Sequence, residues 1–205
     1  LKAIKPFIRI GYKEFTQEKS AFNSAMSYTL KRAVTGSGKE IKIDFDRALV
    51  SMGTLMPIFE GAATVSNHQM TFNWKDNSGM GNAERTDIVM VLVYNKDREA
   101  AVYDTEAALR SDCHAGLQLP EDWQDDELVA YLSFCSTDGN CVANSICLPI
   151  SVIEIPEEEI DVQTESIDTT HKRILPDKRT VHQSRITVHS LSAPPNEIQT
   201  YRCET

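Results

Sequence analysis

The sequence predicts a mainly β fold: an antiparallel β-sandwich of immunoglobulin or fibronectin type III character, preceded by one α-helix and followed by a polar, extended C-terminal tail. Between residues 41 and 155, about seven short apolar segments alternate with turns, which is typical of such sandwiches. Helical periodicity precedes them, and residues 156–205 hold no aromatic side chain before Tyr201. We therefore divide the chain into a lead-in strand and helix (1–40), a sandwich domain (41–155) and a tail (156–205).

Residues 1–40 predict a short strand followed by a helix. Residues 7–12 alternate between apolar and polar side chains, as a short strand or an ordered lead-in would. Beyond them, Thr16 or Ser20 can cap a helix that stops at the Gly36-Ser37-Gly38 stretch. Its apolar side chains recur at near-helical spacing and predict one buried stripe, which consists of Phe15, Phe22, Met26, Leu30 and Ala33.

The apolar period changes to two residues beyond position 40, which is typical of half-buried strands. Segment 88–94 is a nearly continuous apolar run and is the best candidate for a core strand. Trp74 and Tyr131 lie on predicted strands and are expected to anchor the core. The other predicted strands include 41–45, 48–51, 70–74, 100–103, 128–135 and 141–150.

The cysteines are expected to be free, partly buried thiols. There are five of them, and an odd number cannot all pair within one chain. None forms a Cys-x-x-Cys unit, which gives little support to a zinc or redox site. A two-residue turn at Asp138-Gly139 would place Cys135 opposite Val142, and a disulfide to Cys141 would then lose its geometry.

The charge limits the kinds of partner. The chain carries a formal charge of −9 and has a pI near 5.0, so it repels phosphate and is not expected to bind nucleic acid or an anionic membrane surface. No apolar run reaches the ~18–20 residues that cross a bilayer, so membrane insertion is not expected. The chain starts at Leu1 without an initiator Met, and we expect that it is processed or truncated.

The sequence predicts no catalytic residue, metal site or cofactor, and therefore a non-enzymatic protein. The five histidines form no His-x-x-x-His pair, and the adjacent Cys113 and His114 would point to opposite faces of a strand. Gly-x-Ser-x-Gly is absent, and Gly36-Ser37-Gly38-Lys39 follows a helix where a phosphate loop would follow a strand. The oxygen-rich loop 76–82 is conceivable as a calcium site, but self-capping turns explain its composition better.

Two segments are candidates for binding. Asp122, Asp125 and Asp126 cluster around Trp123, which fits either a sugar or cation site with the ring as platform, or a solvated crossover whose ring docks on the sandwich; the second interpretation is favoured. In the tail, β-branched alternation predicts a strand that can pair with an open sheet edge of this chain or of a neighbour. Its residues are Arg185, Ile186, Thr187, Val188, His189 and Leu191.

Four stretches of the sequence resemble a Bacteroidota family of unknown function. They read KPFIRIGYK from Lys5, AFNSAMSY from Ala21, DNSGMGNA from Asp76 and VANS from Val142. The resemblance covers about residues 5–152, and it implies a basic Gly- and Ser-containing segment upstream of Leu1. The family has no assigned activity, so the resemblance implies no catalytic residue. The tail lies outside it.

These observations favour a structural or interaction protein, a subunit of a surface filament or a phage-like particle that is joined through sheet edges and the tail. Its partners would be further copies of itself or other protein subunits, at the cell surface, outside the cell or in a virion. The alternative is an extracellular ligand- or carbohydrate-binding module that uses Trp123 and its neighbouring acids.

Overall fold

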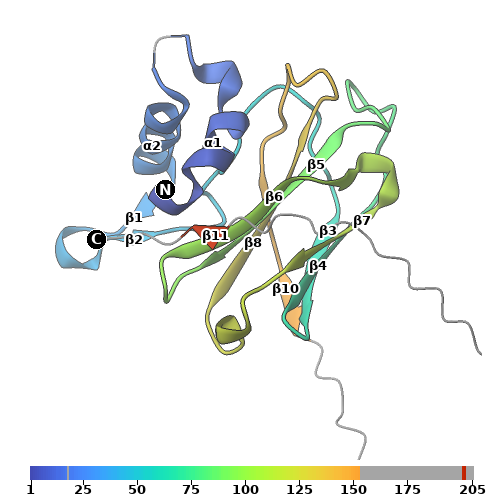
Figure 1. Cartoon of the computed structure of the whole chain (residues 1–205). Helices are drawn as coiled ribbons and strands as arrows, with labels where there is room; N and C mark the ends of the chain where they lie inside the picture. Colours follow the sequence, from blue (N-terminus) through green and yellow to red (C-terminus); the bar gives the residue numbers. More distant parts are fainter. Residues whose placement is uncertain (18, 153–199, 202–205) are drawn as a thin grey trace, which may run out of the picture. The chain divides into compact units, whose positions relative to one another are not determined.

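A computed structural model describes residues 1–17, 19–152 and 200–201 of the chain. All of them belong to one compact unit, which consists of Leu1–Ile155 and Glu197–Thr205. The unit is mainly β, with three sheets and two short α-helices near its N-terminus (Figure 1).

The first residues form a helix, whereas the sequence predicts a short strand or an ordered lead-in. Helix α1 (Lys5–Gly11) follows a 3-10 turn over Lys2–Ile4, and Pro6 lies in its first turn, where the missing N–H costs no hydrogen bond. The alternation in residues 7–12 is therefore not that of a strand. Phe7 and Ile8 are fully buried, because the apolar residues of this short helix pack against the sheet beneath it.

Helix α2 (Ala21–Arg32) confirms the predicted helix but buries another face. Ser20 caps it by accepting a hydrogen bond from the Asn23 N–H, at 3.2 Å. The predicted stripe is wrong in part: Leu30 is 62% exposed and Phe15 is 41% exposed, whereas Ala33 is buried. The buried face of the helix consists of Ala21, Ala25 and Thr29, because small side chains let α2 lie close to α1.

Two larger sheets form the body of the molecule (Figure 1). The four-stranded sheet has the order β10 (Ile150–Val152), β3 (Gly61–Ser66), β4 (Gln69–Trp74) and β7 (His114–Gln118). The five-stranded sheet has the order β11 (Thr200–Tyr201), β6 (Ala100–Leu109), β5 (Ile88–Asn95), β8 (Leu128–Cys135) and β9 (Ile146–Leu148). All neighbours are antiparallel except β10 and β3.

Three predicted strands differ from the observed ones. Segment 41–45 contributes only β2 (Lys42–Ile43), which forms a small exposed hairpin with β1 (Val34–Thr35). Segment 141–150 is not one strand: β9 belongs to the five-stranded sheet and β10 to the four-stranded one, so the chain changes sheets at Pro149.

Segment 48–51 is buried in part without being a strand. The Ser145 Oγ accepts hydrogen bonds from the Val50 and Ser51 N–H groups at 2.9 and 3.3 Å. The Ser51 Oγ donates to the Ala143 carbonyl at 2.8 Å and lies 2.6 Å from the Ser133 Oγ. Ser145 of the VANS stretch therefore satisfies two backbone N–H groups of this segment with its side chain, and its own N–H donates to the Ser51 carbonyl at 3.0 Å.

The core lies on both faces of the five-stranded sheet. On one face, β5 and β8 pack against β4 of the other sheet, and the Trp74 and Phe134 rings meet edge to face with centroids 6.2 Å apart. On the other face, α1 covers Met90 and Leu92 of β5. The predicted core anchors are confirmed, since Trp74 is 6% exposed and Tyr131 is 2% exposed.

Candidate functional site

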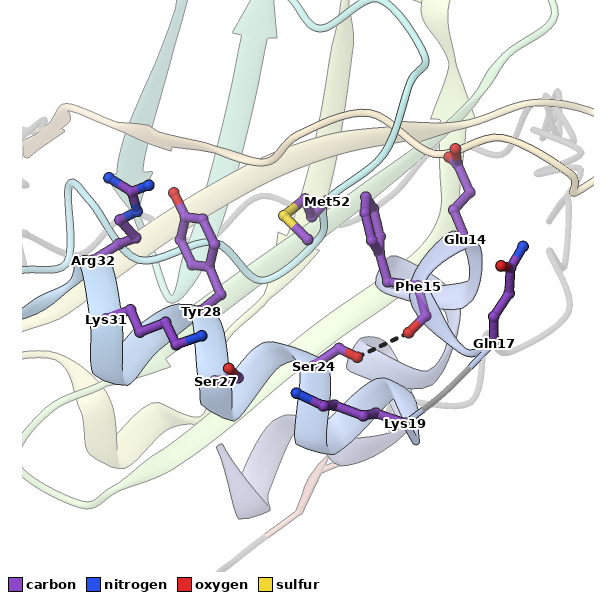
Figure 2. Close-up of a pocket in the computed structure, with 10 residues that line it drawn as sticks. All are labelled: Glu14, Phe15, Gln17, Lys19, Ser24, Ser27, Tyr28, Lys31, Arg32 and Met52. Atoms are coloured by element: carbon purple, nitrogen blue, oxygen red, sulfur yellow. Dashed lines mark hydrogen bonds between the residues drawn. The ribbon is translucent and has the colours of Figure 1, made fainter.

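A hollow of about 560 Å³ opens along one side of α2 (Figure 2). The helix supplies one wall, the 3-10 turn Lys13–Phe15 with the residues after it supplies another, and Met52 comes from the loop that leads to β3. We call it the basic hollow. Its lining residues are Glu14, Phe15, Gln17, Lys19, Ser24, Ser27, Tyr28, Lys31, Arg32 and Met52.

Hydrogen bonds hold the two walls of the basic hollow in place. The Ser24 Oγ donates to the Phe15 carbonyl at 2.8 Å, which ties the 3-10 turn to α2 (Figure 2). The Glu14 carboxylate accepts from the Val142 N–H at 2.7 Å and from the Thr54 hydroxyl at 2.9 Å. Both Glu14 oxygens therefore accept hydrogen bonds that hold the fold together.

Apart from Glu14, the charged side chains among the described lining residues are positive. Lys19, Lys31 and Arg32 are exposed, and no ion pair joins them to a carboxylate of the described residues. Residues 1–42 carry nine Lys and Arg against three Asp and Glu, although the whole chain is at −9. Such a surface attracts carboxylates or other anions. The motifs of the sequence do not predict this site, although the excess of Lys and Arg over Asp and Glu in residues 1–42 indicates a basic surface.

The predicted ligand platform forms an acidic patch around a buried ring. Trp123 is 3% exposed and belongs to the core, so its faces are covered and it docks on the sheets. The Arg98 guanidinium binds Asp122 at 2.7 Å and also binds Asp126, which in turn accepts from the Asn95 amide at 2.8 Å. Asp125 is exposed. The acidic side chains do lie close together, but the Trp123 ring between them is not accessible to a ligand.

We call residues 96–99 and 121–127 the acidic patch. It contains seven Asp and Glu against two Lys and Arg. The hydrogen bond from Arg98 lowers the pKa of Asp126, and the bond from Asn95 adds to this. Lys96 pairs with Glu127, and the Asp97 carboxylate accepts from the Glu127 N–H at 2.7 Å. These bonds join the β5–β6 turn to the crossover, so the excess negative charge sits on an ordered surface.

The DNSGMGNA loop is held by a buried arginine, and its oxygens are occupied by hydrogen bonds. Arg110, fully buried, pairs with Asp87 at 2.9 Å and donates to the Asn77 Oδ1 at 2.7 Å. Asn77 donates to the Pro57 carbonyl and Asn82 accepts from the Met56 N–H, both at 2.8 Å. The guanidinium also lies over the Phe134 ring, 3.7 Å from its centroid. In the described part of the chain, the polar side chains of this loop therefore stabilise the fold.

The edge of β6 is paired with the end of the chain. Thr200 lies opposite Val102 and Tyr201 lies opposite Ala101, in antiparallel register. The predicted partner strand of Arg185, Ile186, Thr187, Val188, His189 and Leu191 lies outside the described residues. Residues 200 and 201 of the tail therefore add to a sheet edge.

Thiols and other titratable groups form no further site in the described part of the chain. Cys113, Cys135, Cys141 and Cys147 are free, and Cys135 faces Val142 as the turn at Asp138-Gly139 predicts. No group of three or more His, Cys, Asp or Glu side chains gathers in metal-binding geometry among residues 1–17 and 19–152. In the same residues, no helix has the length and apolar character that a bilayer span requires.

The fold and its surfaces define a mainly β protein with a basic helical face and an acidic patch, held together by a core on both sides of one sheet. The chain belongs to a family described as a family of unknown function, DUF6266, and the match covers residues 1–149. This confirms the resemblance to a family without assigned activity. Neither the curated proteins nor the solved structures contain a match.

Proposed function

We propose that this protein is a non-enzymatic structural subunit whose copies join through backbone pairing at the β6 edge, with the end of the tail as the donated strand. The assembly would be a surface filament or a phage-like particle of a Bacteroidota bacterium. The observation that carries the proposal is the pairing of Thr200 and Tyr201 with β6.

The β6 edge supports the proposal because backbone pairing there needs no particular side chain. An exposed edge binds an added strand through its N–H and C=O groups, and the same groups bind the strand of a neighbour equally well. A segment that pairs with its own domain can exchange with the identical segment of another copy at low cost.

The length of the tail also supports exchange. Forty-seven residues separate Val152 from Thr200. An extended chain spans at most about 3.3–3.6 Å per residue, so this segment can reach roughly 150 Å. That reach far exceeds the width of one domain, and a neighbouring copy lies within it.

The test compares the full chain with two shortened variants, one lacking residues 200–205 and one lacking residues 156–205. At about 1 M salt, where charges are screened beyond roughly 3 Å, we expect the full chain to form oligomers in light scattering and both variants to be monomeric, with unchanged near-ultraviolet circular dichroism. Oligomers that survive the shorter deletion at this salt concentration would rule out strand exchange through β11, and oligomers that survive the longer one would rule out any role of the tail.

The finer fold assignment is part of the proposal. We infer a sandwich of the immunoglobulin or fibronectin type III kind from two mostly antiparallel sheets that share one core and from the sheet change at Pro149. An experimental structure with a different strand order would contradict it. Carbohydrate binding is the weaker alternative, because the ring of Trp123 is covered.

A further inference from the structure

We propose that the basic hollow of one copy binds the acidic patch of a second copy, so that copies associate head to tail. This interface would be separate from strand exchange at β6, and it deepens the proposed function because it rests on the protein being an assembly subunit. The carrying observation is that two ordered surfaces of opposite charge exist on one chain and do not neutralise each other.

The hollow offers unpaired cations above an apolar floor. Lys19, Lys31 and Arg32 make no ion pair with a described carboxylate, although the β body is rich in carboxylates. Tyr28, Met52 and Phe15 follow one another across the hollow (Figure 2). A partner that supplies carboxylates with some apolar stem would fill both parts of this surface.

The acidic patch has the matching properties. Arg98 binds Asp122 and Asp126 and thereby orders the crossover, while Glu121 and Asp125 remain exposed beside them. After the two cations of the patch are counted, five negative charges are left over. Charges already held by the fold lose little conformational freedom on binding, so the patch is suited to a partner with several cations.

The Glu14 wall of the hollow and the acidic patch lie at opposite ends of β5, and no ion pair of the described residues joins the cations of the hollow to the acids of the patch. Glu14, on the wall of the hollow, binds the N–H of Val142, which lies beside Cys135 at the start of β5. Asn95, which binds Asp126, is at the other end of that strand. The seven steps from the first to the last residue of this strand span about 23 Å. Because the two surfaces differ, their contact is heterologous, and such contacts repeat into a ring or an open filament.

Charge reversal tests the interface. One variant carries Lys31→Glu and Arg32→Glu, a second carries Glu121→Lys and Asp125→Lys, and a third combines all four. These side chains are exposed, so folding is retained. Sedimentation velocity at low salt should show at least a tenfold weaker association for each of the first two variants. The third should return to within about threefold of the unaltered chain, since opposite charges again face each other.

A matched control and a salt series complete the test. Lys39→Glu with Lys42→Glu makes the same change in net charge outside the hollow and should leave association unchanged. Association of the unaltered chain should weaken as the salt concentration rises above about 0.15 M, where the screening length is about 8 Å. Failure of the four-fold variant to recover, or an equal effect of the control, would overturn the proposal. Weakening by the first variant alone would also overturn it and would indicate a different acidic partner.

The experiments distinguish a failure of the strand-exchange proposal from a failure of the charged-interface proposal. The variant lacking residues 200–205 keeps both charged surfaces, so it should retain salt-sensitive association even when it has lost the contact at β6. If that variant is a monomer at every salt concentration while the charge reversals have no effect, strand exchange stands and the charged interface is wrong.

Discussion

At the scale of single residues, Arg110 is the side chain on which the DNSGMGNA loop depends. It is fully buried and forms bonds to Asp87, Asn77 and the Met56 carbonyl. Arg110→Met would leave the Asp87 carboxylate buried without its cation, and such a loss costs about 3–5 kcal/mol. Urea unfolding should show this decrease in the free energy of unfolding, whereas Arg85→Met, at an exposed position, should change it little.

A paired replacement separates the charge from the packing. In Arg110→Met combined with Asp87→Asn, both charges are gone and the Asn side chain can still accept from the Glu84 N–H. The double variant should therefore be more stable than Arg110→Met alone. Equal stabilities would mean that the loss comes from packing against Phe134 and not from an unpaired buried charge.

Cys147 illustrates how burial controls reactivity. Burial, followed by the hydrogen bond with Asp46, raises the pKa of its thiol to about 12. Only the thiolate reacts, so alkylation by iodoacetamide at pH 8 should be at least roughly a hundredfold slower in the folded protein than in urea, measured by peptide mass spectrometry. Because the folded state holds this proton more tightly, its stability should fall as the pH rises from about 9 towards 12.

The variant Asp46→Asn is the control for that experiment. Burial is the larger cause of the raised pKa, so most of the protection of Cys147 should remain when the carboxylate is neutralised. Alkylation at the rate of the unfolded chain would instead assign the protection to the Asp46 hydrogen bond.

At the scale of elements, the periods of the sequence located helices and strands better than they located faces. The apolar run 88–94 became the central strand β5, with neighbours on both sides. The sequence also predicts the helix α2, but the buried stripe of large apolar side chains that it predicts differs from the observed buried face. A helix that lies close to another buries its smallest side chains, and that requirement comes from the partner helix and not from its own sequence.

Local sequence also lacks the information that would have predicted α1 and the sheet change at Pro149. A seven-residue helix such as α1 is too short for its period to be told from alternation. The sheet change at Pro149 depends on which sheet edge lies nearby, which local sequence does not contain. For the candidate site, the acids of the patch were found because they are neighbours in the chain. The basic hollow was missed because the net charge of −9 for the whole chain conceals the excess of Lys and Arg in residues 1–42.

The face assignment of α2 gives a direct prediction. Ala25 is fully buried, so Ala25→Leu should overpack the contact with α1 and cost about 1–3 kcal/mol. Leu30→Ala should change the free energy of unfolding by less than about 0.5 kcal/mol, because Leu30 is mostly exposed. Urea titrations of both variants check this, and the opposite order of effects would restore the stripe that the sequence alone suggests.

At the scale of the whole molecule, the five-stranded sheet carries two core clusters, one shared with the helices and one shared with the four-stranded sheet. Phe7 of α1 is fully buried and meets Tyr103 of β6 edge to face, with ring centroids 5.7 Å apart. Met90 and Leu92 of β5 belong to the same cluster as Phe7, while Val91 and Val93 of that strand face the other sheet. Because β5 contributes to both faces, loss of the helices would expose one side of the central sheet.

We therefore expect residues 1–152 to unfold in a single cooperative transition. Far-ultraviolet circular dichroism and the fluorescence of Trp74 and Trp123, which lie on the side away from the helices, should give the same urea midpoint. Phe7→Ala should lower both midpoints together and cost about 3–5 kcal/mol, whereas Phe59→Ala, at a position 61% exposed, should leave them nearly unchanged. If Phe7→Ala lowered only the dichroism midpoint, the helices would be a separately folding layer, and the basic hollow would be able to open while the sheets stay folded.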